Sequence, residues 1–274
     1  VPDKINSFLY GMLKALVPIL FIILMAIYSY NVLLQTKKIE VLKQQFSSIS
    51  TDKSVQVLLI TWGFGGLLEG MAGFGTAVAI LISLGFRPVF SALVSLIANS
   101  VPTAFGAVGV PVIVLAQETG LPVIPLSTAV VLQLSVLMLF VPLVITFLAD
   151  PRMKALPKNL LLSLLVGGVS LATQYLAARY IGAETPAIVG AIASIIVIVV
   201  IGKLTGKGGE KPIPMTYSGG EVFRAWAVYV LIMMLILFTS PLFPAVREML
   251  SGVCSSTMSF MIGGEERKYT IQWL

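Results

Sequence analysis

The sequence predicts an all-α fold, a polytopic bundle of transmembrane helices in which some helices are broken or re-entrant. First, 57% of its 274 residues are hydrophobic and only 11% are charged, whereas soluble domains carry about 25% charged residues. Second, the apolar residues form several uncharged runs of about 20 residues, the length that a helix needs to cross a bilayer. Third, two runs are interrupted by glycines. We expect a single integral membrane domain over residues 1–274, with a broken-helix region at 55–117.

The first predicted elements lie before this broken-helix region. Residues 15–34 form an uncharged run after Lys14, whose amine can reach the membrane interface, and they predict the first span. In the polar stretch at 35–53, three apolar residues recur at helical spacing and indicate a short interfacial helix. These residues are Ile39, Leu42 and Phe46.

The two interrupted segments cover residues 55–86 and 88–117, with Arg87 between them. Arg87 is interpreted as an anchor at the membrane boundary. Backbone that leaves the helix inside a bilayer must be covered by protein or line an aqueous cavity. We expect such backbone near the glycines of these segments. They are Gly63, Gly65, Gly66, Gly70, Gly73 and Gly75 in the first, and Gly106 and Gly109 in the second.

Four uninterrupted spans are predicted after the broken-helix region. They are the uncharged runs 123–149, 160–178, 185–202 and 225–243. In the third run, the small-residue pairs Ala187/Ala191 and Gly190/Ser194 are spaced four apart, which allows a neighbouring helix to pack closely. From Ala245 onward no further span is predicted, because the apolar run is short and rich in serine.

The basic residues predict which loops share one side of the membrane. The segments 37–53, 152–158 and 203–224 are basic, and basic loops tend to lie on the cytoplasmic side. Three apolar segments separate the first basic loop from the second, and three full crossings would place these loops on opposite sides. We therefore expect one interrupted segment to be re-entrant, with an extra crossing as the alternative.

Residue types argue against several classes of function. The chain has no histidine and a single cysteine, Cys254, so it offers no histidine-ligated metal site and no internal disulfide. The net charge is +6, but the basic residues gather between apolar runs, as expected for a protein that contacts the lipid bilayer rather than nucleic acid. No nucleophile with a base is apparent. We expect no cofactor, no metal and no enzymatic activity.

The broken-helix region is the expected site of function, because half-helices inside a membrane offer free peptide N–H groups to an anion. Thr76 could cap one half-helix, and Pro111 suits the first turn of another after Gly109. Two such N-termini aimed at one cavity would hold a carboxylate without a buried cation.

Glu69 is the candidate for proton coupling. It lies deep within an apolar stretch, where an ionised carboxylate costs about 3 kcal/mol, so loss of water favours the neutral form. An ionised Glu69 would repel a substrate anion in the same cavity, whereas a protonated Glu69 would not. Proton and anion binding would then be coupled. The alternative is a structural glutamate that is hydrogen-bonded to unwound backbone.

The candidate substrate-binding residues flank the two breaks. Asn99 both donates and accepts hydrogen bonds, which suits a 2-hydroxy acid, although interhelical hydrogen bonding would explain it equally well. Gln133, Gln174 and Tyr175 lie in regular spans and are interpreted as structural. The full candidate set is Gly73, Phe74, Gly75, Thr76, Asn99, Ser100, Thr103, Gly106 and Gly109.

Two long motifs carry a family resemblance. Leu67–Ile80 reads LLEGMAGFGTAVAI, and Gly85–Gly120 reads GFRPVFSALVSLIANSVPTAFGAVGVPVIVLAQETG. Both resemble the bacterial L-lactate permease family, and GGEVFRAW at Gly219–Trp226 resembles it weakly. The resemblance implies proton-coupled symport of L-lactate, or a related monocarboxylate such as glycolate, across the bacterial cytoplasmic membrane. Family members are longer, and this chain begins Val1-Pro2-Asp3-Lys4, so we expect a central part of such a transporter.

Other functions remain open at this stage. A passive anion channel, or a transporter of a different carboxylate, would use the same glycine breaks, but a channel needs no protonatable Glu69. A purely structural membrane subunit would follow if Glu69 and the glycines only served packing. Accumulation of substrate against its gradient separates a coupled transporter from a channel.

Overall fold

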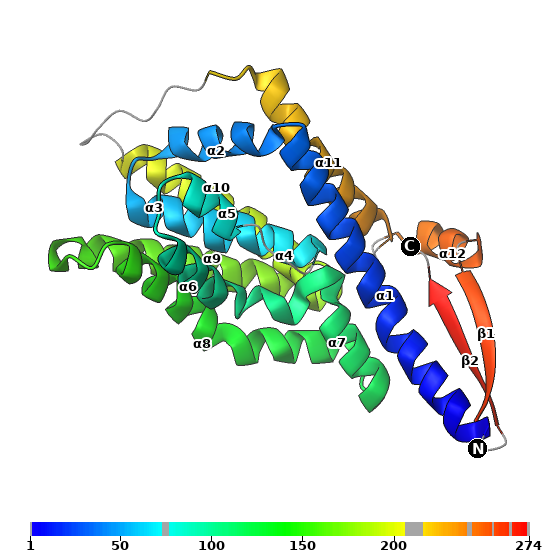
Figure 1. Cartoon of the computed structure of the whole chain (residues 1–274). Helices are drawn as coiled ribbons and strands as arrows, with labels where there is room; N and C mark the ends of the chain where they lie inside the picture. The colour runs from blue at the N-terminus through cyan, green and yellow to red at the C-terminus, as the bar shows by residue number, and fades with distance from the viewer. Residues whose placement is uncertain are drawn as a thin grey trace.

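Figure 1 shows the computed structural model, which describes residues 2–72, 77–205, 216–239, 243–253, 255–262 and 265–272. Within these ranges the chain is helical apart from one pair of strands, which confirms the predicted helical bundle. The elements up to the second break are α1 (Pro2–Gln35), α2 (Lys38–Ile49), α3 (Lys53–Leu58), η1 (Leu59–Gly65), α4 (Gly66–Ala72), α5 (Ala77–Ser83), α6 (Pro88–Asn99), η2 (Pro102–Phe105) and α7 (Gly106–Thr119). They are followed by α8 (Val123–Ala149), η3 (Met153–Ala155), α9 (Leu156–Tyr180), α10 (Pro186–Thr205), α11 (Gly219–Thr239), α12 (Pro244–Val253), β1 (Ser255–Ile262) and β2 (Glu265–Gln272).

In the described part of the chain, four helical segments are long and apolar enough to cross a membrane, or five if one bent pair is counted as a span. These segments are Lys53–Met71, Val123–Ala149, Met153–Tyr180 and Pro186–Leu204, and the bent pair is Pro88–Asn99 with Pro102–Thr119. The bounds of α8 match the predicted span, and α9 extends a few residues beyond both predicted ends.

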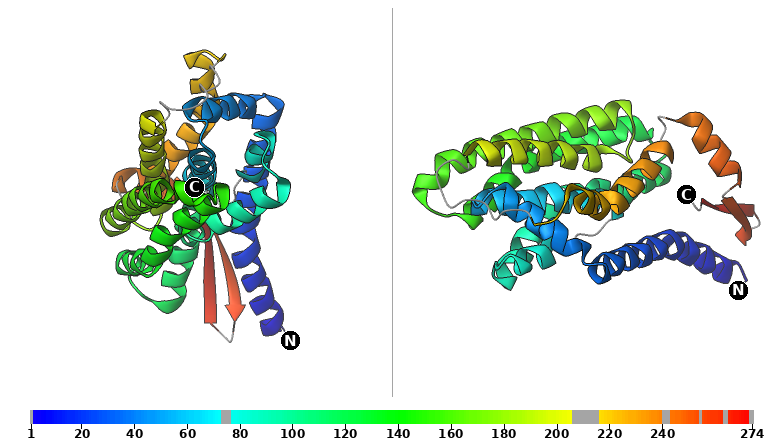
Figure 2. Two further views of the ribbon diagram at one scale, coloured as in Figure 1. Left: turned by 90° about the vertical axis from the view of Figure 1, so that its left-hand side faces the viewer. Right: turned by 90° about the horizontal axis from the view of Figure 1, so that it is seen from above.

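Small residues hold the long helices α8, α9 and α10 close together (Figure 2). A Cβ atom on Gly167 of α9 would lie 2.4 Å from the carbonyl oxygen of Met138 in α8, so only glycine allows this approach. On α10, a Cβ atom on Gly190 would lie 2.4 Å from Cγ of Gln174 in α9. The predicted close packing at Gly190 is therefore confirmed.

The first interrupted segment contains a π-helix, η1, between α3 and α4. The wider turn of a π-helix displaces the helix that follows it. The π-helix η1 lies against α10, where a Cβ atom on Gly63 would lie 2.8 Å from Cγ1 of Ile195. After α4, the chain continues in α5, which lies beside η1 so that a Cβ atom on Gly65 would lie 3.4 Å from that of Ala77. The chain is nevertheless helical without interruption from Lys53 to Ala72, so the prediction of non-helical backbone near Gly63, Gly65, Gly66 and Gly70 was wrong, because a π-helix accommodates the glycines there. The glycines Gly73 and Gly75 lie outside the described residues.

The second interrupted segment bends by 55° between α6 and the helices η2 and α7. Ala107, Val108 and Gly109 have φ values of 45°, 62° and 75°, a left-handed conformation that costs a non-glycine residue roughly 1–2 kcal/mol. Regular α-helix resumes beyond Gly109 with Pro111 near its start, as predicted. Arg87 lies exposed directly before α6.

Contacts gather the described parts of the three basic segments at one end of the molecule. The Lys158 ammonium forms an ion pair with Asp52, which also caps α3 by accepting a hydrogen bond from the Val55 N–H group at 3.1 Å. Trp226 Nε1 donates to Gln45 Oε1 at 2.7 Å, which brings the start of α11 to α2. This arrangement agrees with the prediction that these loops share one side. Lys207 and Lys211 lie outside the described residues.

Helix α2 forms where the interfacial helix was predicted, but its apolar face covers protein. Ile39, Leu42 and Phe46 are buried. The Phe46 ring lies 5.1 Å from that of Phe64 in η1, and 6.5 Å from that of Trp226. Burying these side chains against η1 and α11 removes the apolar surface that a membrane-bound helix would present to lipid.

The two strands β1 and β2 form an antiparallel hairpin that extends from the bundle beside α1 (Figures 1 and 2). The Asn6 amide donates to the Met261 carbonyl oxygen at 3.0 Å, and the rings of Tyr10 and Phe260 lie 5.6 Å apart. The sequence predicted no span here, in agreement with the structure, but it did not predict strands. Cys254 lies outside the described residues.

Candidate functional site

Glu69 lies in α4 at the contact between the two broken segments. Its side chain is buried, with 3% of its surface exposed. Its Oε2 atom accepts a hydrogen bond from Asn99 Nδ2 at 2.9 Å, and Asn99 is the last residue of α6. The side-chain amide at the end of α6 therefore faces α4. Each broken segment therefore contributes one polar group to the same contact.

Thr103 and Gly106 complete the surroundings of this pair. The Thr103 hydroxyl donates to the Asn99 carbonyl oxygen, which ties η2 to the end of α6. A Cβ atom on Gly106 would lie 2.8 Å from Glu69 Oε1, closer than real Cβ contacts occur. The start of α7 thus approaches the carboxylate so closely that any side chain at position 106 would require the Glu69 carboxylate to shift.

The left-handed turn at the start of α7 lies against the loop before α10. A Cβ atom on Gly109 would lie 2.1 Å from the carbonyl oxygen of Ala183. Thr185, directly before α10, is 1% exposed, and its hydroxyl oxygen has no hydrogen-bond partner among the described residues. The first turn of α10 also has peptide N–H groups without partners in the helix, and these carry a partial positive charge.

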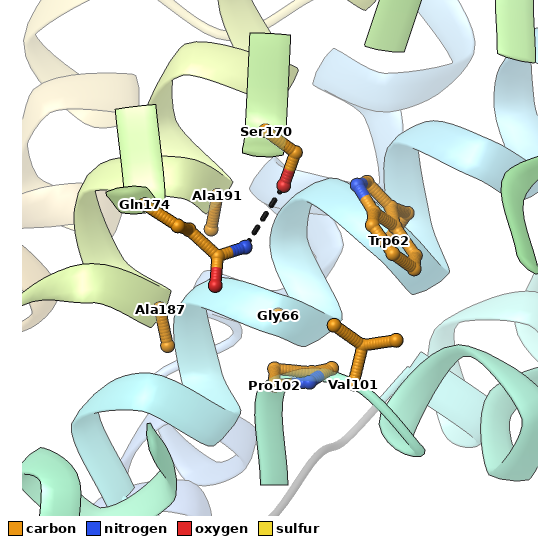
Figure 3. Close-up of a pocket in the computed structure, with 8 residues that line it drawn as sticks. All are labelled: Trp62, Gly66, Val101, Pro102, Ser170, Gln174, Ala187 and Ala191. Atoms are coloured by element: carbon orange, nitrogen blue, oxygen red, sulfur yellow. Dashed lines mark hydrogen bonds between the residues drawn. The ribbon is translucent and has the colours of Figure 1, made fainter. Parts of the chain in front are cut away.

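A small pocket opens beside the Glu69–Asn99 contact, with enclosed space for about one water-sized group. Figure 3 shows that Gln174 and Ser170 of α9 lie on one side of the pocket and Trp62 on another. Gln174 Nε2 donates to Ser170 Oγ at 2.9 Å. Gln174 Oε1 is buried and finds no donor in the part of the chain that the structure describes. The pocket is lined by Trp62, Gly66, Val101, Pro102, Ser170, Gln174, Ala187 and Ala191.

The pocket and the Glu69–Asn99 contact are parts of one region. Gly66 lines the pocket and precedes Glu69 by one turn of α4, about 5 Å along the helix axis. On the other side, Val101 and Pro102 line the pocket directly after the end of α6 at Asn99. We call this combined region the central site.

Small residues bring the walls of the central site together. A Cβ atom on Gly70 would lie 3.0 Å from that of Ala187, and one on Gly66 would lie 3.7 Å from that of Ala191. The small pair Ala187/Ala191 of α10 therefore faces the glycines of α4, which confirms the close packing predicted from their spacing. Side chains of ordinary size here would push α4 away from α10.

The structure brings four of the predicted residues together: Glu69, Asn99, Thr103 and Gly106. Gly109 lies near them in sequence but contacts the loop before α10. Ser100 is exposed, and its hydroxyl donates to the Ile97 carbonyl oxygen at 2.7 Å, so it does not take part. Gly73, Phe74, Gly75 and Thr76 lie outside the described residues.

The sequence did not predict that Gln174 and Ser170 line a pocket, or that Thr185 is buried without a hydrogen-bond partner in the described chain. Gln174 was interpreted as a structural residue of a regular span. Its spacing of four from Ser170 is the one signal in the sequence, because residues four apart lie on the same face of a helix. That signal indicates a polar face but not what the face meets.

The electrostatics of the central site favour one negative charge at a time. The residues that line the pocket are all uncharged. An anion about 4 Å from an ionised Glu69 would be repelled by about 4 kcal/mol at an effective dielectric constant of about 20. A neutral Glu69 removes this repulsion. An ionised Glu69 and a second anion in the pocket would therefore disfavour each other.

Comparison with known proteins gives one consistent family. A family model described as L-lactate permease matches residues 2–268. The chain is 38% identical to an L-lactate permease of Streptococcus iniae, covering 100% of this chain and 59% of that protein. It is 33% identical to the L-lactate permease of Bacillus subtilis, over 92% of this chain and 48% of that protein. It is 34% identical to the glycolate permease GlcA of Escherichia coli, over 83% of this chain and 45% of that protein.

The chain spans about half the length of the curated relatives that it matches. No solved structure matches it. The apolar helices make the chain a multi-pass membrane protein.

Proposed function

The chain belongs to the L-lactate permease family, and from this membership we propose that it forms the part of a transporter that binds substrate and proton. The transporter carries L-lactate, or a related 2-hydroxy monocarboxylate, together with a proton across the bacterial cytoplasmic membrane. One observation carries the proposal. A buried Glu69 in α4 meets Asn99 at the end of α6, where the second interrupted segment bends by 55°.

Coupling follows from competition between two negative charges. While Glu69 is ionised, the substrate carboxylate is repelled from the central site. Protonation from the side of higher proton concentration removes the repulsion, and the Asn99 amide can still donate to the neutral carboxyl group. Anion and proton then occupy the site together and leave it together. Substrate accumulates where the proton concentration is lower.

The substrate class rests on the relatives and on the chemistry of the site. The relatives described above are named for lactate and glycolate, which are both small 2-hydroxy acids. The α10 N-terminus and the Thr185 hydroxyl offer donors that suit a carboxylate. Donors of this kind bind an anion without a buried lysine or arginine.

The test uses the full-length protein in proteoliposomes with an alkaline interior. For one proton per lactate, a gradient of one pH unit supports about tenfold accumulation of radiolabelled L-lactate. Glu69→Gln should reduce accumulation to equilibrium, because the amide can no longer take up and release a proton. Counterflow exchange of labelled for unlabelled lactate should remain. The matched control is Glu118→Gln, which changes an exposed glutamate at the end of α7.

The outcomes separate the alternatives. Proton-driven accumulation by Glu69→Gln at the unmodified level would remove Glu69 from the mechanism. Lactate flux in the unmodified protein that only equilibrates, whatever the pH gradient, would make it a passive anion channel. Competition by glycolate, pyruvate and acetate then ranks the substrates.

A further inference from the structure

We propose that Gln174 recognises the hydroxyl group of the substrate, and that it thereby selects 2-hydroxy acids over monocarboxylates that lack this group. The proposal rests on the proposed transport function and assigns a specificity residue to it. Gln174 lies on α9, outside both broken segments, and its Oε1 atom is the acceptor that would meet the hydroxyl.

The first step is the unused acceptor. Gln174 is 3% exposed, and its amide nitrogen donates to Ser170 Oγ at 2.9 Å. This hydrogen bond fixes the direction of the amide and leaves Oε1 buried without a donor from the described chain. Buried polar atoms in proteins are nearly always hydrogen-bonded, and an unmet acceptor is costly. A ligand that donates one hydrogen bond here would satisfy it.

The second step is the character of the pocket. Except for the Ser170–Gln174 pair, its lining is apolar or aromatic, with Trp62, Val101 and Pro102 facing α9 (Figure 3). A carboxylate accepts hydrogen bonds but cannot donate them, so Oε1 would repel it. The hydroxyl group of a 2-hydroxy acid is the complementary part, because it presents one O–H donor and is about the size of a water molecule. The carboxylate would lie outside the pocket.

The third step is that neighbouring residues keep Gln174 in this position. A Cβ atom on Gly190 would lie 2.4 Å from Cγ and 2.7 Å from Nε2 of Gln174. The glutamine therefore occupies space that only glycine leaves free on α10. The pocket also adjoins Glu69 through Gly66, so a substrate held by Gln174 lies next to the proposed proton site.

The experiment compares affinities for lactate and for propionate, which has the same carbon chain without the hydroxyl group. Both are measured as inhibition constants against radiolabelled L-lactate uptake by the full-length protein in proteoliposomes. Gln174→Leu keeps the approximate size of the side chain but removes the acceptor. We expect the inhibition constant for lactate to rise by about tenfold or more, and that for propionate to stay within about twofold.

Two further variants make the result decisive. Gln133→Leu makes the same change at an exposed position of α8 and should leave both constants unchanged. Gln174→Asn keeps an amide but withdraws it from the pocket, because its side chain is one methylene shorter. It should also raise the inhibition constant for lactate but not that for propionate. It therefore serves as the test if Gln174→Leu fails to fold. Monodispersity in detergent establishes folding.

The outcomes distinguish this inference from the function on which it rests. Absence of lactate uptake by the unmodified protein would contradict the proposed function. Normal uptake with an unchanged lactate-to-propionate ratio in the folded Gln174 variants would overturn the role of Gln174 alone. An equal loss of affinity for both acids would also overturn it, because it would indicate a packing role.

Discussion

At the scale of single residues, the contact between Glu69 and Asn99 joins positions that are 30 apart in the chain. Sequence reasoning selected both residues, Glu69 because a buried carboxylate is costly and Asn99 because it is polar near a break. It could not predict that they meet, because the direction of the chain after each glycine cluster depends on tertiary packing. For the same reason the sequence did not predict that Gln174 lines the pocket, since an amide that faces a pocket and one buried in a helix contact have the same sequence.

Gly106 provides a test of this contact at one position. Gly106→Ala would place a methyl group 2.8 Å from Glu69 Oε1. The carboxylate would have to move away from the Asn99 amide, so we expect proton-driven lactate accumulation to fall by at least about tenfold. Uptake into proteoliposomes measures this. The control is Gly168→Ala, where the new methyl group would meet no described atom within 4 Å. Similar uptake by both variants would contradict the described geometry.

At the scale of elements, sequence predicted the regular helices well and the irregular ones in part. An uncharged run with polar residues at both ends fixed the bounds of α8, because each charged residue is costly inside a bilayer. The left-handed turn at residues 107–109 was predictable from Gly109 and Pro111. The π-helix η1 was not predictable from the local sequence. It lies where Ile195 of α10 packs over Gly63, and this contact depends on tertiary structure. The β-hairpin was missed because its residues show no strong alternation of apolar and polar side chains.

The turn at the start of α7 leads to a prediction on stability. Gly109 and Gly120 have similar φ values of 75° and 69°, so alanine at either position costs roughly 1–2 kcal/mol of backbone strain. At Gly109 the new methyl group would also overlap the Ala183 carbonyl oxygen, whereas at Gly120 it would meet nothing within 4 Å in the described structure. We expect Gly109→Ala to destabilise the protein by about 3 kcal/mol or more.

Thermal unfolding in detergent, followed by size-exclusion chromatography, compares the two variants. Gly120→Ala is the matched control for strain without overlap. If Gly109→Ala and Gly120→Ala lower Tm by the same amount, the loop before α10 does not lie against α7 as described.

At the scale of the whole molecule, the basic loops define one end of the bundle and the α7–α8 connection lies at the other. The ion pair between Asp52 and Lys158 links two of these loops directly. Helix α8 spans Val123–Ala149, or about 40 Å at 1.5 Å per residue, which exceeds the hydrocarbon thickness of a bilayer. Charge patterning in the sequence predicted this grouping because positive loops are retained on one side.

Accessibility labelling tests this topology. In a background that carries Cys254→Ser, single cysteines replace exposed residues at Thr51, Arg152, Lys203 or Leu121. We expect a membrane-impermeant maleimide to label the first three from one side and Leu121→Cys from the other. Labelling of Thr51→Cys and Arg152→Cys from opposite sides would contradict the pairing of Asp52 with Lys158.

The glycines of η1 and α4 that contact α10 restrict how these helices can move. Ile195 packs against Gly63, and Ile188 packs against Gly70. Because these side chains interdigitate, we expect α10 and the η1–α4 segment not to slide along each other. For the proposed transport function, we therefore expect rearrangement at the other contact of α4, where the hydrogen bond between Glu69 and Asn99 joins it to α6. We expect the gain or loss of one proton at Glu69 to change the strength of this contact between α4 and α6.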